Sequence, residues 1–327
     1  MDKEKSITIL GKEILPGTSH QVNVDIARLP TRSKVDIPVF INRAKKEGPS
    51  LLIMAGIHGD ELNGIEIVRQ IVANKWNVPQ HGTVICIPLL NVFGFLNKTR
   101  ELPDGRDLNR VFPGSKTGAL ASQFAHKLMT EIIPHIDYCI DYHTGADSRF
   151  NFSQTRVSND DPELIELARI FGAPFALLSD HRERSFREQA TKLGKKVILF
   201  EGGKALDFNR SVTRSGLSGA LRIMHHLGIR DFSEELSAFA EPDKTIILSD
   251  SSWLRAKYAG LYRSLVKAGS FVKKGDVVGT ITDPYGTFEA KVKAHQKGWI
   301  ICTNHSPMVN MGDAIMHIGT SNESSTD

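Results

Sequence analysis

Short apolar runs alternate with helical patterns between residues 50 and 227, and this alternation restricts the possible folds more than any other feature of the chain. Five short apolar runs predict strands: 50–56, 83–90, 138–141, 175–178 and 196–200. Patterns with helical spacing predict helices between and after them: 65–74, 121–133, 162–171, 185–193 and 214–227. Strands that alternate with helices predict an α/β fold with a largely parallel sheet, in which ligands bind at the carboxyl ends of the strands.

Both ends of the chain have a different pattern. Residues 1–45 alternate apolar and polar side chains, which predicts a meander of strands. After Pro242 the chain consists of short β-like runs with many glycines, and the motif V-x-x-G-D occurs twice, at 272–276 and 309–313. We therefore expect a catalytic domain at 1–242, a small all-β, barrel-like domain at 243–320 and a disordered tail at 321–327.

Composition and charge exclude several classes of protein. The chain has 41 Lys and Arg against 37 Asp and Glu, and no dense basic run, so nucleic acid is not an expected partner. No stretch reaches the roughly 18 apolar residues needed to span a membrane, and the charged start of the chain does not have the pattern of a signal peptide. We expect a cytoplasmic protein, and the sequence leaves open whether it forms a homo-oligomer.

A histidine and a glutamate directly follow the predicted strand 50–56, in the motif G-I-H-G-D-E, and suggest a metal site. His58 and Glu61 are three residues apart on a glycine-rich turn, and His143 ends the predicted strand 138–141 before a glycine. Two imidazoles, one carboxylate and a water form a common catalytic zinc site, and Asp141 could orient one ligand. The alternative is a loop histidine and a buried structural histidine without a metal.

A further carboxylate ends the predicted strand 196–200. Glu201 follows an apolar run and precedes two glycines. A hydrolase that uses a metal-bound water needs a group to accept its proton, and Glu201 is our candidate for this general base. The alternative is a glutamate at a strand end that only contacts solvent.

The loop at 100–114 contains three arginines in eleven residues, Arg100, Arg106 and Arg110, and also Asn109. Guanidinium groups bind carboxylates with two parallel hydrogen bonds, and an arginine beside a metal can stabilise an oxyanion. The alternative is a solvated basic loop that two aspartates of the same loop partly neutralise.

Four motifs in this order resemble the succinylglutamate desuccinylase/aspartoacylase family, a branch of the zinc carboxypeptidase superfamily. They are G-x-H-G-D-E-x-x-G, R-x-x-x-D-G-x-D-L-N-R-x-F-P-G, D-x-H-T-G and E-G-G, within residues 56–203. The resemblance implies a carboxypeptidase-like mixed sheet with helices on both faces, followed by a β-domain. It also implies one zinc ion per chain, bound by His58, Glu61 and His143.

The same resemblance implies roles for the other candidates. Glu201 would be the general base, and Asn109 and Arg110 would bind a carboxylate of the substrate. An arginine upstream in the loop would polarise the scissile carbonyl; we assign this role to Arg100, with Arg106 as the competitor.

The C-terminal β-domain resembles lipoyl or biotinyl carrier domains. Such carriers need a lysine at the tip of a hairpin, and the equivalent tip at 282–287 has none. Lys291 lies further along, in an apparent strand. We therefore expect a structural lid rather than a swinging arm.

These observations favour an amidohydrolase that cleaves the acyl amide of a small N-acyl amino acid. Two alternatives remain: a zinc carboxypeptidase for short peptides, and a protein that binds a metal or ligand without catalysis.

Overall fold

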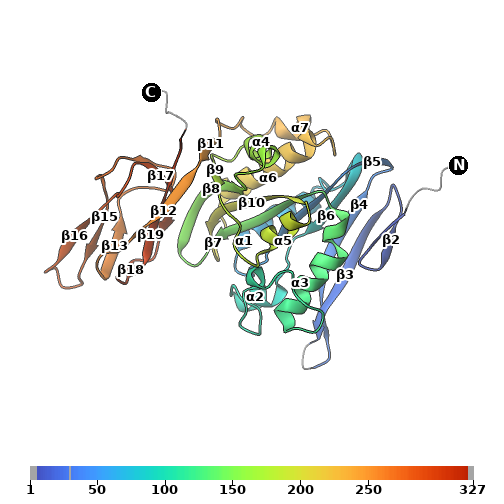
Figure 1. The fold of residues 1–327 in the computed structure, drawn as a ribbon, viewed down its shortest axis with the longest axis horizontal. Coiled ribbons are helices and arrows are strands. Elements are labelled where there is room, and N and C mark those ends of the chain that lie inside the picture. The colour runs from blue at the N-terminus through green and yellow to red at the C-terminus, as the bar shows by residue number, and fades with distance from the viewer. Residues whose placement is uncertain (1–5, 29–30, 323–327) are drawn as a thin grey trace.

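A computed structural model describes residues 6–28 and 31–322, which form an α/β structure around one large sheet (Figure 1). Its helices are α1 (Leu62–Ala73), α2 (Val92–Asn97), α3 (Leu120–Glu131), α4 (Pro162–Phe171), α5 (Phe186–Lys192), α6 (Arg210–His226) and α7 (Ser233–Leu236), with short 3₁₀ turns at Leu108–Arg110 and Ile133–His135. The strands of the first two thirds are β1 (Ile7–Ile9), β2 (Lys12–Ile14), β3 (Ser19–Arg28), β4 (Lys34–Arg43), β5 (Lys46–Ala55), β6 (His81–Ile87), β7 (Tyr138–Gly145), β8 (Arg149–Val157), β9 (Phe175–Leu178) and β10 (Lys196–Lys204). The C-terminal strands are β11 (Ile246–Leu248), β12 (Asp250–Arg255), β13 (Gly260–Ser264), β14 (Phe271–Val272), β15 (Val277–Thr282), β16 (Glu289–Lys293), β17 (Gly298–Asn304), β18 (Met308–Val309) and β19 (Ala314–Thr320).

The five predicted strands and five predicted helices are all present, and the mixed α/β fold is confirmed. The large sheet has the strand order β12-β19-β17-β8-β10-β7-β5-β6-β4-β3. Along this order only the centre is parallel, from β6 through β5 and β7 to β10, and β4 and β8 join it antiparallel on either side. Off this order, β9 pairs in parallel with β8 and with β11. The expectation of a largely parallel sheet is therefore correct for the centre and for this short branch, and the whole sheet is mixed. The further likeness to carboxypeptidases stays a prediction.

Helices cover both faces of the central strands because these strands are apolar on both faces. Leu51, Ile53 and Ala55 of β5 pack in a core with α1, α4 and α6, whereas Leu52 and Met54 pack in a second core with α3 and α5. This alternation follows from the strand geometry, which points successive side chains to opposite faces. The continuous apolar run in β5 therefore stabilises two helical layers at once.

Strands of the C-terminal β-region pair with strands of the large sheet. Strand β17 pairs with β8, β19 pairs with β17, and β12 pairs with β19, so three of its strands extend the sheet beyond β8. Strands β16, β15, β13 and β18 form a second sheet, at the opposite end of the molecule from β3 and β4 (Figure 1). The expected β-rich region is present, but it is joined to the α/β part through a continuous ladder of paired strands; the domain boundary at 242/243 stays a prediction.

The hairpin tip predicted at 282–287 joins β15 to β16, and Lys291 lies within β16 as expected. Of the predicted disordered tail, residues 323–327 lie outside the described residues. Among the helices of residues 6–28 and 31–322, none combines the length and apolar character that a membrane crossing requires.

Close packing of α6 against α1 and β7 depends on Gly216. A Cβ at this position would lie 2.3 Å from Ile67 Cδ1 on α1, and the Gly216 carbonyl accepts a 2.8 Å hydrogen bond from the Tyr142 hydroxyl of β7. A glycine in a helix interior is unfavourable by itself. Here it permits the helices to approach each other over the core.

We expect Gly216→Ala to lower the free energy of unfolding by about 1–3 kcal/mol, the usual effect of overpacking, as measured by urea denaturation. Ile67→Val removes the Cδ1 atom that the new methyl group would contact. The double variant should therefore lose less stability than the sum of the two single variants. Strictly additive losses would show that this contact does not limit the packing.

Candidate metal centre and its cavity

A cavity of about 840 Å³ opens at the carboxyl ends of the central strands. Its wall includes His58 and Glu61 after β5, His143 on β7 and Glu201 on β10. Strands β12, β17 and β19 of the C-terminal β-region contribute to the wall as well. The polar motifs of the sequence thus meet where parallel strands end, as expected for an open α/β sheet.

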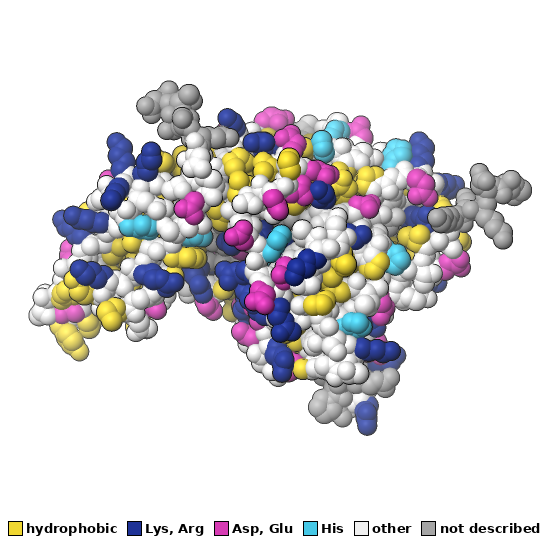
Figure 2. Space-filling view, in the orientation of Figure 1, with side chains coloured by type: hydrophobic (Ala, Val, Ile, Leu, Met, Phe, Trp, Pro, Cys, Tyr) yellow, Lys and Arg dark blue, Asp and Glu magenta, His cyan; other side chains and the backbone are white. Residues whose placement is uncertain are grey.

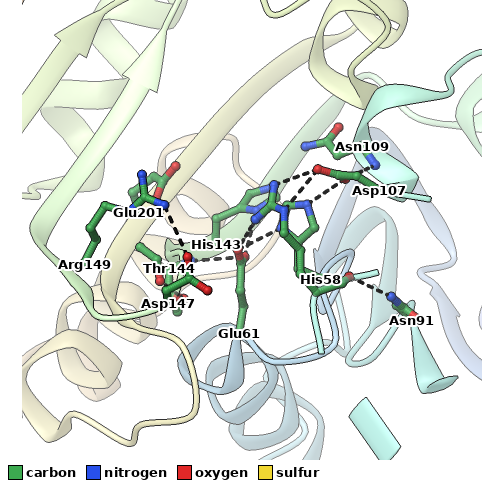
Figure 3. A network of polar contacts seen from close by, with 12 residues as sticks. His58, Glu61, Asn91, Asp107, Asn109, His143, Thr144, Asp147, Arg149 and Glu201 are labelled. Atoms are coloured by element: carbon green, nitrogen blue, oxygen red, sulfur yellow. Dashed lines mark hydrogen bonds and ion pairs between the residues drawn. The ribbon is translucent and has the colours of Figure 1, made fainter. Parts of the chain in front are cut away.

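The three predicted metal ligands converge on one point. His58 Nδ1 lies 2.8 Å from Glu61 Oε1, and His143 Nδ1 lies 2.9 Å from Glu61 Oε2. One ligand atom from each residue lies within 4.8 Å of the others, and all three side chains are buried. Figure 3 shows them pointing toward one another, His58 and Glu61 from the turn after β5 and His143 from the end of β7.

Two aspartates hold the far nitrogens of these imidazoles. His58 Nε2 lies 3.1 Å from Asp107 Oδ1, and His143 Nε2 lies 3.0 Å from Asp141 Oδ2. A neutral imidazole that donates Nε2–H to a carboxylate has its lone pair on Nδ1. Both lone pairs would then face the acceptor oxygens of Glu61, an arrangement that requires a cation or protons between them. These residues therefore fit a divalent metal ion with imidazole and carboxylate ligands.

Without a metal ion, the pKa shifts of these three side chains show the same need for positive charge beside Glu61. Burial lowers the pKa of His58, but the charge of Glu61 and the hydrogen bonds with Asp107 and Glu61 outweigh burial and raise it above its ordinary value. For His143, the charges of Asp141 and Glu61 overcome burial and raise the pKa well above its ordinary value. Burial raises the pKa of Glu61, but the two histidines hold it far below its usual range. Negative charge therefore surrounds the site, and it is matched by positive charge at the two imidazoles.

A close backbone approach forms the turn that presents His58 and Glu61. A Cβ on Gly59 would lie 2.0 Å from the backbone of Gly94 in α2, so no other residue fits here without movement of the chain. The Glu61 N–H donates to the His58 carbonyl at 3.4 Å, which closes the turn. The glycines of the motif therefore position the ligands rather than bind the metal themselves.

Arg100 lies beside the candidate metal ligands. Its Nη1 donates to Glu61 Oε1 at 3.3 Å, and its Nε and Nη2 donate to Asp107 Oδ2 at 3.1 and 2.9 Å. The fork on Asp107 fixes the plane of the guanidinium. Asp107, which our sequence analysis considered only as a neutralising charge, therefore orients both Arg100 and His58.

Glu201 lies next to His143 across the β10–β7 ladder. Its Oε2 accepts a 2.6 Å hydrogen bond from Asn151 Nδ2, and its Oε1 lies 3.8 Å from Arg156 Nη2. Asn151 and Arg156 belong to β8, whose pairing with β10 shifts register between Glu201 and Gly203. The carboxylate is therefore held by a neutral donor and faces the cavity.

The basic loop divides into two parts. Asn109 and Arg110 line the cavity, and Asn109 Oδ1 accepts from the Phe186 N–H at 2.8 Å, which leaves the Nδ2 amide as its donor. Arg106 does not line the cavity: its side chain is 56% exposed and its Nε lies 3.8 Å from Asp104 Oδ2. The structure therefore does not bring Arg106, the competitor of Arg100, to the other candidate residues; its charge faces solvent and a local aspartate.

Other residues of the cavity wall were not found from the sequence. Strand β8 was not predicted, because its polar residues break the apolar pattern that identified the other strands. Trp253 and His317 stack at 4.3 Å with an interplanar angle of 5° and line the cavity. The remaining unexpected cations are Lys98, Arg149, Arg156, Arg182 and Arg187.

Comparison with known proteins gives the family. The model of the succinylglutamate desuccinylase/aspartoacylase catalytic domain matches residues 47–227, more than half of the chain. An N-alpha-acetyl-L-2,4-diaminobutyric acid deacetylase of Halomonas elongata is 28% identical over 295 residues, which cover 86% of this chain and 84% of that protein.

Solved structures agree over nearly the whole chain. A succinylglutamate desuccinylase/aspartoacylase from Rhodobacter sphaeroides is 25% identical with a TM-score of 0.81, covering 93% of this chain and 95% of that one. The product-bound ectoine utilization protein EutE (DoeB) from Ruegeria pomeroyi shares the fold at 20% identity, with a TM-score of 0.82 over 97% and 98% of the two chains. The chain belongs to the succinylglutamate desuccinylase/aspartoacylase family.

Proposed function

We propose that this chain is a zinc-dependent amidohydrolase that cleaves the acyl amide bond of a small N-acyl amino acid. The observation that carries this proposal is the convergence of His58 Nδ1, His143 Nδ1 and the Glu61 carboxylate, each imidazole being held from behind by an aspartate. The Halomonas relative is a deacetylase of an N-acetyl amino acid, which supports the same reaction class here.

His58, Glu61 and His143 would hold one zinc ion. Nitrogen and carboxylate ligands suit zinc, and three protein ligands leave a position for water or substrate. When bound, zinc supplies a Lewis acid that polarises the acyl oxygen and lowers the pKa of a coordinated water to about 7. The remaining steps depend on the surrounding side chains.

Glu201 would act as the general base. Its carboxylate neighbours His143 in the sheet, and Asn151 orients it by a single hydrogen bond. Glu201 would accept a proton from the attacking water and then donate it to the amine that leaves. The products would be a carboxylate and a free amino acid.

Arg100 would stabilise the negative charge that develops on the acyl oxygen. It contacts the Glu61 carboxylate at 3.3 Å, and its orientation is fixed by Asp107. A preoriented donor in a site shielded from water stabilises a developing oxyanion strongly.

Asn109 and Arg110 would bind a carboxylate of the substrate. The Asn109 amide and the Arg110 guanidinium line the same cavity, and a guanidinium group can bind a carboxylate with two parallel hydrogen bonds. The C-terminal strands β12, β17 and β19 contribute to the wall, which favours small substrates over long peptides.

Metal analysis of the purified chain should give one zinc per chain, and N-acetyl and N-succinyl amino acids should be hydrolysed faster than dipeptides. Both classes carry the carboxylate that Asn109 and Arg110 would bind, but a dipeptide adds an ammonium group beside the acyl carbon, where the metal ion and Arg100 would repel it. Quantification of the released amino acid measures it. Faster release from dipeptides would favour the carboxypeptidase alternative.

His58→Ala should remove stoichiometric zinc and hydrolytic activity. Only two of the three proposed ligands would remain, and Asp107 would lose its imidazole partner. His226→Ala, an exposed histidine of α6, is the matched control and should retain both. The measurements are elemental analysis and initial rates. Full zinc content in His58→Ala would reject the proposed site.

Glu201→Gln should reduce kcat by about 10²- to 10⁴-fold, the usual contribution of a general base, while zinc content stays at one per chain. The amide is nearly isosteric with the carboxylate, so the cavity should keep its shape. Unchanged kcat would exclude Glu201 as the base. Absence of hydrolysis in the unsubstituted chain as well would favour the non-catalytic alternative.

A further inference from the structure

Asn91 is a buried polar residue between β6 and α2 that has no part in the proposed function. It is 0% exposed and is not one of the residues that line the cavity. Figure 2 shows Lys and Arg side chains gathered at the hollow beside the C-terminal β-region, whereas Asn91 lies below the surface, on the opposite side of His58 from Glu201 (Figure 3). Any role of Asn91 therefore comes from the protein groups that it binds.

The main chain of Asn91 is bound to the strand end that carries two of the candidate metal ligands. Its N–H donates to the Gly56 carbonyl at 2.7 Å, and both residues are buried. Gly56 directly follows β5, and His58 is two residues further along the chain. Asn91 is therefore fixed relative to the turn that presents His58 and Glu61.

The side-chain oxygen of Asn91 caps helix α2. Asn91 Oδ1 accepts a hydrogen bond from the Gly94 N–H at 2.8 Å, the usual contact of a helix N-cap. Gly94 is also the residue whose main chain lies against Gly59 in the turn after β5. The cap therefore holds the start of α2 beside that turn.

The side-chain nitrogen of Asn91 binds the main chain beside the candidate oxyanion arginine. Asn91 Nδ2 donates to the Arg100 carbonyl at 3.1 Å and to the Glu101 carbonyl at 3.3 Å. A side-chain amide has two N–H donors, so both hydrogen bonds can form at once. Each polar atom of this buried side chain therefore has a partner, as buried polar groups generally do.

Few other contacts hold the main chain at Arg100. Residues 95–99, which lead to it, are exposed. Across residues 6–28 and 31–322, the hydrogen bonds to the main chain of Arg100 and Glu101 come from two side chains, that of Asn91 and, at 3.5 Å, that of Thr99. The point from which the Arg100 side chain extends is therefore determined mainly by Asn91.

Arg100 is consequently held at both ends. Asp107 fixes the plane of its guanidinium, and Asn91 binds its carbonyl. The contact of Arg100 Nη1 with Glu61 Oε1, at 3.3 Å, is long for a hydrogen bond between charged groups. A small shift of the main chain would therefore be enough to break it.

We propose that Asn91 is a positioning residue for the proposed reaction and sets the place of Arg100 relative to the metal ligands. This inference rests on the proposed function, in which Arg100 stabilises the developing oxyanion. Asn91 binds the strand end before His58 on one side and the main chain of Arg100 on the other, so one residue joins the two parts of the oxyanion site. The metal ligands themselves are placed by the pairing of β5 with β7 and do not depend on it.

Asn91→Asp removes the donor and keeps the cap, because a carboxylate oxygen still accepts from the Gly94 N–H. The second oxygen would face the carbonyls of Arg100 and Glu101, to which it cannot donate. We expect kcat for the best N-acyl amino acid to fall about 10- to 100-fold, the effect of misplacing a catalytic group by about 1 Å. KM and zinc content should stay close to those of the unsubstituted chain, because the carboxylate site and the zinc ligands keep their places.

Asn209→Asp is the matched control. Asn209 caps α6 as Asn91 caps α2, and its Oδ1 accepts from the Val212 N–H at 3.2 Å. Its Nδ2, however, has no acceptor in the part of the chain that the structure describes. The same substitution at the same helix position therefore removes no hydrogen bond, and kcat, KM and zinc content should all be retained.

A double-mutant cycle with Arg100→Gln distinguishes positioning from a general structural effect. Because Asn91 acts through Arg100, Asn91→Asp should lower kcat by less than about twofold in the Arg100→Gln background. An equal fall in both backgrounds would overturn the proposal. Asn91→Ser keeps a good cap residue and also loses the donor, so it should reproduce the kinetics of Asn91→Asp. Loss of folding in both Asn91 variants would show that Asn91 maintains the fold, and would overturn the proposal as well.

Crystal structures of the full-length variants separate this inference from the proposed function, because they require no turnover. In Asn91→Asp, the Arg100 guanidinium should lie farther than 3.3 Å from Glu61, while His58, Glu61 and His143 stay together. This result without hydrolysis by the unsubstituted chain would support the positioning role and refute the amidohydrolase. Hydrolysis with Arg100 unmoved and additive losses of kcat would do the opposite. Displacement of the three metal ligands together with Arg100 would also overturn the proposal.

Discussion

The site depends on one carboxylate that faces two imidazoles. Glu61 is 1% exposed and lies between the Nδ1 atoms of His58 and His143, which come from the ends of different strands. A buried carboxylate is stable only if positive charge compensates it. The turn after β5 and the end of β7 therefore have to meet at this point, and they bring the rest of the motif residues with them.

The register of the sheet brings the ends of β5 and β7 together. Strands β5 and β7 pair in parallel with Met54 opposite Asp141 and Ala55 opposite Tyr142, so the residues that follow each strand emerge at the same edge. Strand β10 pairs with β7 and places Glu201 opposite His143. A slip of one residue would turn His143 toward the opposite core, so the register that buries the apolar residues also places the polar ones.

The link between strand register and the position of the polar residues explains which parts of the structure could be predicted from the sequence. The central strands are apolar runs, and each is followed by a motif, so both the strand and its chemistry could be predicted from residues close together in sequence. Strand β8 carries Arg149, Asn151 and Arg156 among its residues and has no such apolar signature. Its position depends on pairing with β10 across about fifty residues, which local patterns do not encode. The same holds for Trp253 and His317, which meet only through the pairing of β12 with β19.

The strands that the sequence did not predict together form one wall of the cavity. An open parallel sheet binds ligands at a shallow edge, but here β8 joins antiparallel to β10, and β17, β19 and β12 continue from it. These strands contribute Asn151, which donates to the Glu201 carboxylate, and they add Arg156 and the Trp253–His317 stack to the cavity wall. The family motifs therefore place the candidate metal ligands, whereas the added strands form the wall that bounds the cavity around them. Transfer of a relative's substrate to this chain is justified only where those strands carry the same side chains.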